Sequence, residues 1–134
     1  MERETILSDD FVTLYYYPGK GVVYHILHKY KYGEPFRKFL MTGVETLRKN
    51  KGTKWLSDDR SYATLTKEDL EWGPAVFAPA AIKAGWKYWA IVMPEKVVGR
   101  MAMAHVVELY GKLGVTVQIV ESPEEGMAWL DSQT

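Results

Sequence analysis

Two short apolar segments, each followed by a polar turn and then by a helical pattern, constrain the fold of this chain most strongly. Residues 53–57 form the first segment, which runs into Asp58, Asp59 and Arg60, and residues 86–93 form the second. Strand–turn–helix units of this kind are typical of α/β folds, whose binding loops follow the carboxyl ends of the strands. The sequence therefore predicts an α/β fold and a place where a ligand would bind.

An antiparallel hairpin is predicted near the N-terminus. Residues 11–17 and 22–27 are rich in aromatic and β-branched side chains, and they flank a Pro-Gly-Lys-Gly sequence that suits a tight turn. We expect residues 4–7 to add a shorter strand before this pair.

Helix signals separate the later strands. The predicted second helix runs through a Gly73-Pro74 break to Ala84, and a last strand is predicted at residues 115–120. Capping patterns and glycines mark the boundaries. The predicted starts are Pro35, Thr66, Pro94 and Ser122, and the predicted stops are Gly52, Gly85 and Gly114.

Together these elements predict one α/β domain over residues 1–134. The chain has 134 residues, 47% of them hydrophobic, which is enough for a substantial core. The N-terminal antiparallel hairpin is followed by parallel strands joined by crossover helices, so the sheet is mixed.

One face of this sheet is expected to remain partly open. We assign Tyr15, Tyr17 and His25 to a strand face that is polar and aromatic rather than aliphatic. If the helices crowd onto the other face, this one is available to a partner. The pattern therefore predicts self-association, as a homodimer.

Composition excludes several classes of protein. The 17 basic and 17 acidic residues cancel and form no block of one sign, which argues against nucleic acid as a partner. Without cysteine there is no disulfide framework or thiolate metal site. No apolar run is long enough for a membrane span, and no signal-peptide core follows the charged first residues. These observations predict a cytoplasmic protein with no membrane span.

The turn after residues 53–57 is the best candidate binding site. Asp58, Asp59 and Arg60 could together fix a polar group or pair with a partner. The alternative is a structural turn in which Arg60 pairs with one of the aspartates. Among the five tryptophans, Trp72 beside the Gly73-Pro74 break is the one we expect to be partly exposed.

No set of residues in the sequence indicates catalysis or metal binding. His105 and Glu108 are spaced for one helix face, but no third ligand can be named. A triad of Ser57, His105 and Asp59 lacks the Gly-x-Ser-x-Gly elbow, and neither phosphate-binding glycine fingerprint occurs. We therefore predict a non-enzymatic protein without a cofactor or metal.

Several segments of the chain resemble the STAS superfamily, in particular the small bacterial proteins called SpoIIAA-like or STAS/SEC14-domain proteins. The resemblance covers residues 53–131 well and the N-terminal strands only in outline. It is carried by residues 55–60, 65–69 with Trp72, 81–90, 115–117 and 122–130.

The resemblance implies a mixed sheet with alternating helices that serves as a protein-interaction or signalling module. In the anti-sigma-factor antagonists of this superfamily, a serine in an Asp-Ser-Ser-Gly type of turn is phosphorylated. Here the equivalent turn reads Ser57-Asp58-Asp59-Arg60-Ser61 and has no glycine. Neither Ser57 nor Ser61 is therefore assigned as a phosphorylation site.

Two functions remain open from the sequence. The first is a regulatory module of the STAS/SpoIIAA-like type that binds a protein partner or itself. The second is a small-molecule or lipid-binding domain that uses the turn at residues 58–60 and nearby aromatic side chains. A closed apolar cavity would favour the second function, and a flat symmetric contact of well over ~1,000 Å² would favour the first.

Overall fold

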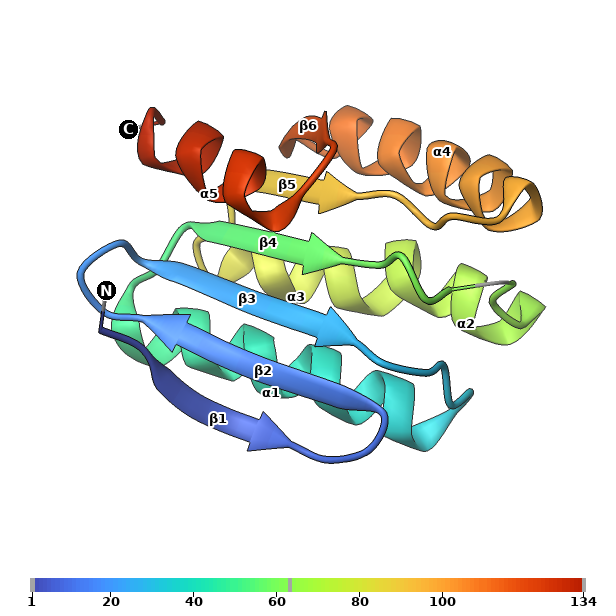
Figure 1. The fold of residues 1–134 in the computed structure, drawn as a ribbon, viewed down its shortest axis with the longest axis horizontal. Coiled ribbons are helices and arrows are strands. Elements are labelled where there is room, and N and C mark those ends of the chain that lie inside the picture. The colour runs from blue at the N-terminus through green and yellow to red at the C-terminus, as the bar shows by residue number, and fades with distance from the viewer. Residues whose placement is uncertain (1, 63, 134) are drawn as a thin grey trace.

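Six strands form a single mixed sheet, in sequence order, in the computed structural model, which describes residues 2–62 and 64–133 (Figure 1). The first two strand pairs are antiparallel, and the third to the sixth strands run parallel to one another. This arrangement confirms the predicted mixed α/β sheet with an N-terminal hairpin. The strands are β1 (Glu4–Ser8), β2 (Val12–Tyr17), β3 (Val22–Leu27), β4 (Lys54–Asp58), β5 (Tyr88–Val92) and β6 (Thr116–Val120).

The helices divide unequally between the two faces of the sheet. One face carries most of them and the larger of two hydrophobic clusters, and the other carries only the C-terminal helix, which packs on β4 and β5 (Figure 1). The first group comprises α1 (Glu34–Asn50), α2 (Lys67–Trp72), η1 (Gly73–Phe77), α3 (Ala78–Lys83) and α4 (Val97–Lys112), and the C-terminal helix is α5 (Pro123–Asp131). No helix within residues 2–62 and 64–133 is long and apolar enough to cross a bilayer.

Local sequence signals explain most of the helix boundaries. The Thr66 hydroxyl accepts the Asp69 N–H at 3.1 Å at the start of α2, and the Ser122 hydroxyl accepts the Glu125 N–H at 3.1 Å at the start of α5. Two predicted boundaries are shifted. Helix α1 ends on Lys51, which adopts the left-handed conformation ahead of Gly52, and α4 begins at Val97 rather than at Pro94.

The Gly73-Pro74 sequence leaves the helical segment unbroken from Lys67 to Lys83. Pro74 and Pro79 have no amide hydrogen to donate within a regular helix. The chain widens instead into the π-helical turn η1, where the Ala78 N–H bonds to the Gly73 carbonyl, five residues earlier. Single π turns of this kind are frequent at functional sites.

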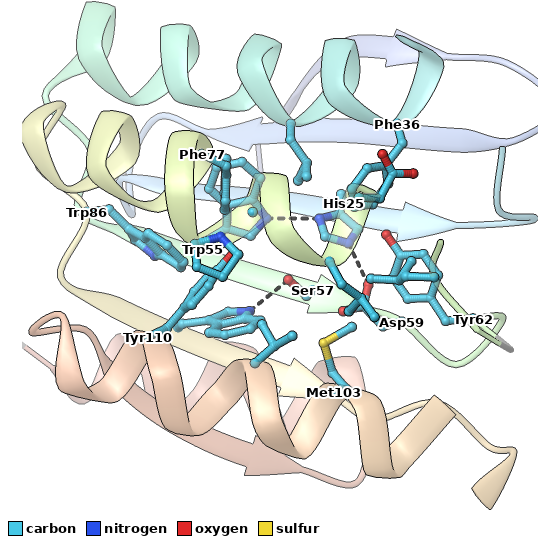
Figure 2. Close-up of a pocket in the computed structure, with 18 residues that line it drawn as sticks. His25, Phe36, Trp55, Ser57, Asp59, Tyr62, Phe77, Trp86, Met103 and Tyr110 are labelled. Atoms are coloured by element: carbon cyan, nitrogen blue, oxygen red, sulfur yellow. Dashed lines mark hydrogen bonds and ion pairs between the residues drawn. The ribbon is translucent and has the colours of Figure 1, made fainter. Parts of the chain in front are cut away.

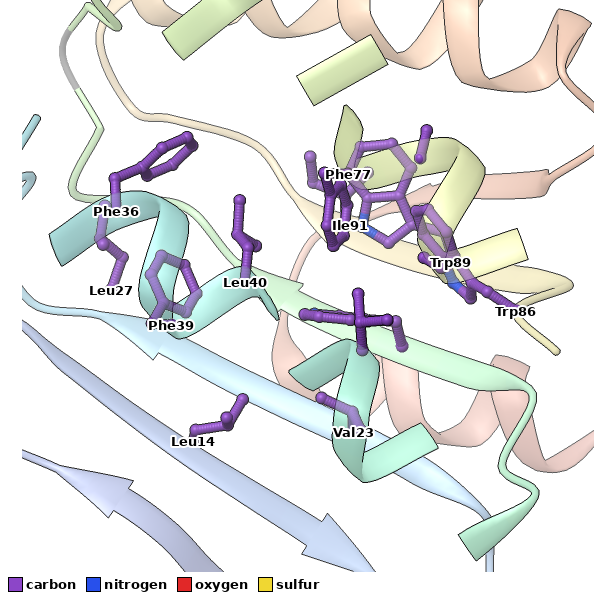
Figure 3. Packing of buried hydrophobic residues seen from close by; sticks show 14 of the residues in the cluster. Leu14, Val23, Leu27, Phe36, Phe39, Leu40, Phe77, Trp86, Trp89 and Ile91 are labelled. Atoms are coloured by element: carbon purple, nitrogen blue, oxygen red, sulfur yellow. The ribbon is translucent and has the colours of Figure 1, made fainter. Parts of the chain in front are cut away.

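The main core lies between the sheet and the helices of the crowded face (Figure 3). Helix α1 lies close to the sheet because Gly43 leaves room for the indole of Trp55, whose ring would be 2.3 Å from a Cβ at that position. Aromatic rings from β4, η1 and β5 continue this layer, and the ring of Trp89 on β5 contacts that of Tyr110 on α4.

The predicted position of His25 on the open face is wrong. In the hairpin register His25 is paired with Leu14, a fully buried residue of the main core, and cross-strand partners share a face. His25 therefore points toward the helices and is 3% exposed.

Tyr15 and Tyr17 do lie on the predicted face, which is the one that carries α5, and they belong to the smaller hydrophobic cluster there. Their rings pack against that of Tyr24, and the Arg3 guanidinium lies 3.9 Å from the centre of the Tyr15 ring. This face is therefore partly shielded by its own side chains.

Candidate functional site

The four residues proposed from the sequence do not form one site. Asp58 shares the α5 face with Leu56 and is held by Arg60 through two hydrogen bonds, of 2.9 Å to Oδ1 and 2.6 Å to Oδ2. Asp59, one residue later, is buried on the other side of the sheet, beneath the helices. Trp72 lies half-buried at the end of α2, with the Arg37 guanidinium 5.5 Å from its ring. Asp59 and the ion pair of Asp58 and Arg60 therefore lie on opposite faces of the sheet.

Asp59 lies in a cavity of about 50 Å³ between the sheet and helices α1, α2, η1 and α4 (Figure 2). Its wall is mostly aromatic and aliphatic, with seven aromatic side chains from Phe36 to Tyr110. The volume is enough for a few water molecules or a very small ligand. The side chains that bring polar atoms to this wall are those of His25, Ser57, Asp59, Tyr62, Asp69 and Tyr110.

A buried hydrogen-bond chain connects Trp55, His25 and Asp59 (Figure 2). The Trp55 indole N–H, which can only donate, lies 2.9 Å from His25 Nδ1. Nδ1 is therefore the acceptor, and the proton of the uncharged ring is on Nε2. Nε2 in turn donates to Asp59 Oδ1 at 2.7 Å. One imidazole donor thus orients the carboxyl group, and no other hydrogen bond reaches that group from residues 2–62 and 64–133.

The register of the strands brings Trp55, His25 and Asp59 together. Trp55 and Ser57 alternate along β4, so both face the helices, and His25 on β3 pairs with Ser57 in the parallel ladder. The ladder extends one residue beyond β4, because the Asp59 N–H donates to the Val92 carbonyl at 3.0 Å. Asp59 therefore keeps the strand periodicity and points into the cavity.

Among the residues that the structure describes, Ser57 has no base positioned to activate it as a nucleophile. The Ser57 hydroxyl accepts the Trp89 indole N–H at 2.8 Å. The ring-nitrogen lone pair of the neutral His25 imidazole, on Nδ1, already accepts the Trp55 N–H. A serine nucleophile needs an imidazole lone pair directed at its proton. His105, the histidine of the triad weighed from the sequence, is exposed on α4. No cluster of three or more potential metal ligands occurs among the described residues.

Burial dominates the electrostatics of the cavity. It raises the pKa of Asp59, and the neighbouring charge of Asp58 adds to this, whereas His25 opposes it. Burial together with the charge of Asp59 also raises the pKa values of Tyr62 and Tyr110, so both hydroxyls stay protonated. Both therefore remain hydrogen-bond donors in the wall of the cavity. No hydrogen bond of either hydroxyl is seen in the part of the chain that is described.

Gly73 determines how closely α4 approaches η1. A Cβ at Gly73 would lie 2.6 Å from the Tyr110 hydroxyl oxygen, well inside contact distance. The absence of a side chain therefore lets the Tyr110 hydroxyl reach the wall of the cavity. The π turn and the glycine within it shape this end of the site.

Asp69 has a structural role in the same wall. Its carboxylate accepts the Gly33 N–H at 3.0 Å, the Arg37 Nε–H at 3.2 Å and the Tyr30 hydroxyl. These bonds join α2 to the start of α1. Both oxygens of Asp69 are thereby satisfied within the protein.

Reasoning from the sequence found Asp59 but missed its partners. The available signal was the spacing of Trp55, Ser57 and Asp59, which alternate and so share one face of an extended chain. His25 and Tyr110 could not be placed beside them, since that requires the hairpin register and the position of α4.

Comparison of the chain with protein-family models, with curated proteins and with solved structures finds no match. The geometry of the cavity is therefore the basis on which a function can be proposed.

Proposed function

We propose that this chain is a small-molecule-binding domain whose ligand occupies the cavity around Asp59. The observation that carries the proposal is an apolar cavity between the sheet and the helices whose wall includes a few polar groups, those of Asp59, Ser57, Tyr62 and Tyr110. Ligand sites in proteins have this character, with an apolar wall for affinity and few polar atoms for orientation. The ion pair of Asp58 and Arg60 lies outside this site.

Binding rather than catalysis is the role that these contacts support. The His25 imidazole is held by Trp55 on one side and by Asp59 on the other, so no lone pair is left to take a proton from a substrate. We therefore propose a non-enzymatic protein.

A STAS/SpoIIAA-like affiliation is part of the same proposal. The sheet order and the covering helices are consistent with the resemblance found in residues 53–131. In this interpretation, ligand binding in the cavity would change how the domain binds its protein partner.

A protein-interaction role is the second candidate, and it is favoured by a surface on α4. Val97, Val98 and Met101 are 61–71% exposed on the first two turns of that helix. Three large apolar side chains on adjacent turns form an exposed apolar patch, and such patches often mark sites of protein–protein contact. We therefore propose α4, rather than the tyrosine-covered sheet face, as the contact surface of a homodimer or of a complex with another protein.

The ligand proposal is tested by a thermal-shift screen of a library of very small compounds. The screen compares the wild type with Val106→Phe, which adds an aromatic ring to the cavity wall, and with Val98→Phe, the same change on the exposed face of α4. Compounds that bind the cavity stabilise the wild type and Val98→Phe by mass action and fail to stabilise Val106→Phe. Hits that stabilise all three proteins equally would place the ligand elsewhere, and a library without hits would count against the proposal.

A further inference from the structure

In the described part of the chain, Asp59 differs from the other two buried aspartates in having no lysine or arginine partner. Asp58 is paired with Arg60, and Asp69 is paired with Arg37 and two further donors. Asp59 is 2% exposed, and the one hydrogen bond that its carboxyl group receives from the described residues comes from the uncharged His25 imidazole. Within residues 2–62 and 64–133 its second oxygen, Oδ2, has no hydrogen-bond partner.

A buried carboxylate without a cation is energetically costly, and a cation within the same cavity would remove that cost. No fully enclosed polar side-chain atom of the described residues lacks a partner, so Oδ2 is not sealed inside the protein. It belongs to the group that lines the cavity, and a ligand there can reach it.

The rest of the wall selects among cations. Metal ions such as Ca²⁺ require six or more oxygen ligands, whereas the wall around Asp59 is dominated by rings and aliphatic side chains. Aromatic rings attract cations that carry little water, alkylammonium ions above all. The side chains of Tyr62 and Phe36 lie at the Asp59 end of the cavity in Figure 2, with Trp55 and Tyr110 farther along it.

We infer that the cavity binds a small organic cation, an alkylammonium group whose N–H donates to Asp59 Oδ2 while its carbon atoms contact the aromatic wall. This inference rests on the proposed function and names the chemical class of its ligand. The volume of about 50 Å³ limits the buried part of the ligand to a few non-hydrogen atoms.

Trimethylammonium and tert-butyl alcohol form a matched pair of probes for this inference. Both have three methyl groups and one hydrogen-bond donor, and only the first is charged at neutral pH. Binding is followed by NMR through the indole N–H signal of Trp55, which reports on the hydrogen bond to His25. We expect trimethylammonium to shift this signal saturably and to bind about tenfold or more tightly than the alcohol. Potassium chloride at the same ionic strength serves as the blank.

Two aspartate variants test the contact itself. Asp59→Asn keeps the shape of the side chain and removes its charge, and Asp58→Asn makes the same change one residue away, on the opposite face of the sheet. We expect Asp59→Asn to lose at least tenfold in trimethylammonium affinity and to bind tert-butyl alcohol unchanged. We expect Asp58→Asn to bind trimethylammonium within about twofold of the wild type, because its charge is already neutralised by Arg60.

The outcomes separate this inference from the proposed function. Equal affinity for the two probes, or full trimethylammonium binding by Asp59→Asn, would overturn the cation inference. If the alcohol still bound the wild type and not Val106→Phe, the cavity would remain a ligand site of neutral chemistry. Absence of trimethylammonium binding at millimolar concentration would also overturn the inference, and binding by Val106→Phe would show that the cation lies outside the cavity.

Discussion

Asp59 carries an electrostatic cost that should be measurable in the unliganded protein. Its pKa is raised above the ordinary value of 3.8, chiefly by burial. The folded protein therefore holds this proton more tightly than the unfolded chain, so the cost is fully present above the folded pKa and is relieved as the pH falls toward 3.8. The ionisable groups that face it are Asp58 on the same strand, His25 on β3, and the hydroxyls of Tyr62 and Tyr110, of which Asp58 carries a charge near neutral pH.

We expect Asp59→Asn to be more stable than the wild type near neutral pH, by an amount that shrinks as the pH is lowered toward 4. The asparagine carbonyl can still accept the His25 N–H, so the hydrogen-bond chain survives while the buried charge is lost. Chemical denaturation of both proteins across this pH range measures the difference. The control, Asp58→Asn, should instead destabilise modestly at neutral pH, since it breaks the pair with Arg60. A less stable Asp59→Asn at every pH would mean that the carboxylate is adequately solvated.

At the scale of the elements, glycines decide how closely the helices approach the sheet. Gly43 on α1 is in contact with the Trp55 indole, which is itself held by its bond to His25. Gly111 on α4 has nothing within 4 Å of the position that a Cβ would take. Replacement of the glycine by alanine should therefore have opposite effects on stability in the two helices.

We expect Gly43→Ala to lower the free energy of unfolding by about 1–3 kcal/mol, because the added methyl group must displace a buried indole. For a domain of this size the melting temperature would fall by several degrees. Gly111→Ala should instead stabilise by about 0.5–1 kcal/mol, as alanine does at unobstructed helix positions. Melting curves of the two variants measure this. Equal stability of both variants would contradict the packing of α1 against Trp55.

The sequence predicted those elements whose signals are local. Ser122 caps its helix through a hydrogen bond to a nearby amide, and the Pro-Gly-Lys-Gly sequence turns the hairpin as expected. The π turn at Gly73 was not predicted, because it depends on two prolines and on the contact with Tyr110. The face assigned to His25 was wrong for a similar reason, since the pairing with Leu14 is set across the hairpin. Local sequence patterns do not determine the register between strands or the packing of distant helices.

At the scale of the whole molecule, α4 separates two surfaces of different character. Its buried side contributes Met103, Val106 and Tyr110 to the cavity wall. Its outer side exposes Val97, Val98 and Met101 in the first two turns. A contact on the outside of this helix is therefore one helix thickness from the cavity, so ligand binding and association could be coupled.

We expect the protein to form dimers through this surface, and Met101→Glu to shift it toward the 15.4 kDa monomer. A charge at the centre of an apolar contact opposes association, whereas the same residue is well solvated in the free subunit. Sedimentation velocity at high micromolar concentration gives the distribution, with Tyr32→Glu as the control at another exposed apolar position. A wild type that sediments only as a monomer would remove α4 as a self-association surface.

A crystal structure of the wild type soaked with trimethylammonium would show directly whether the cavity around Asp59 holds an organic cation. We expect density for the cation inside the cavity, with its nitrogen about 3 Å from Asp59 Oδ2 and its methyl groups against the aromatic wall. The bonds from Trp55 to His25 and from His25 to Asp59 should persist unchanged. Density for the cation only at the protein surface, or a cavity that holds nothing but ordered water at a saturating concentration of the probe, would contradict this expectation.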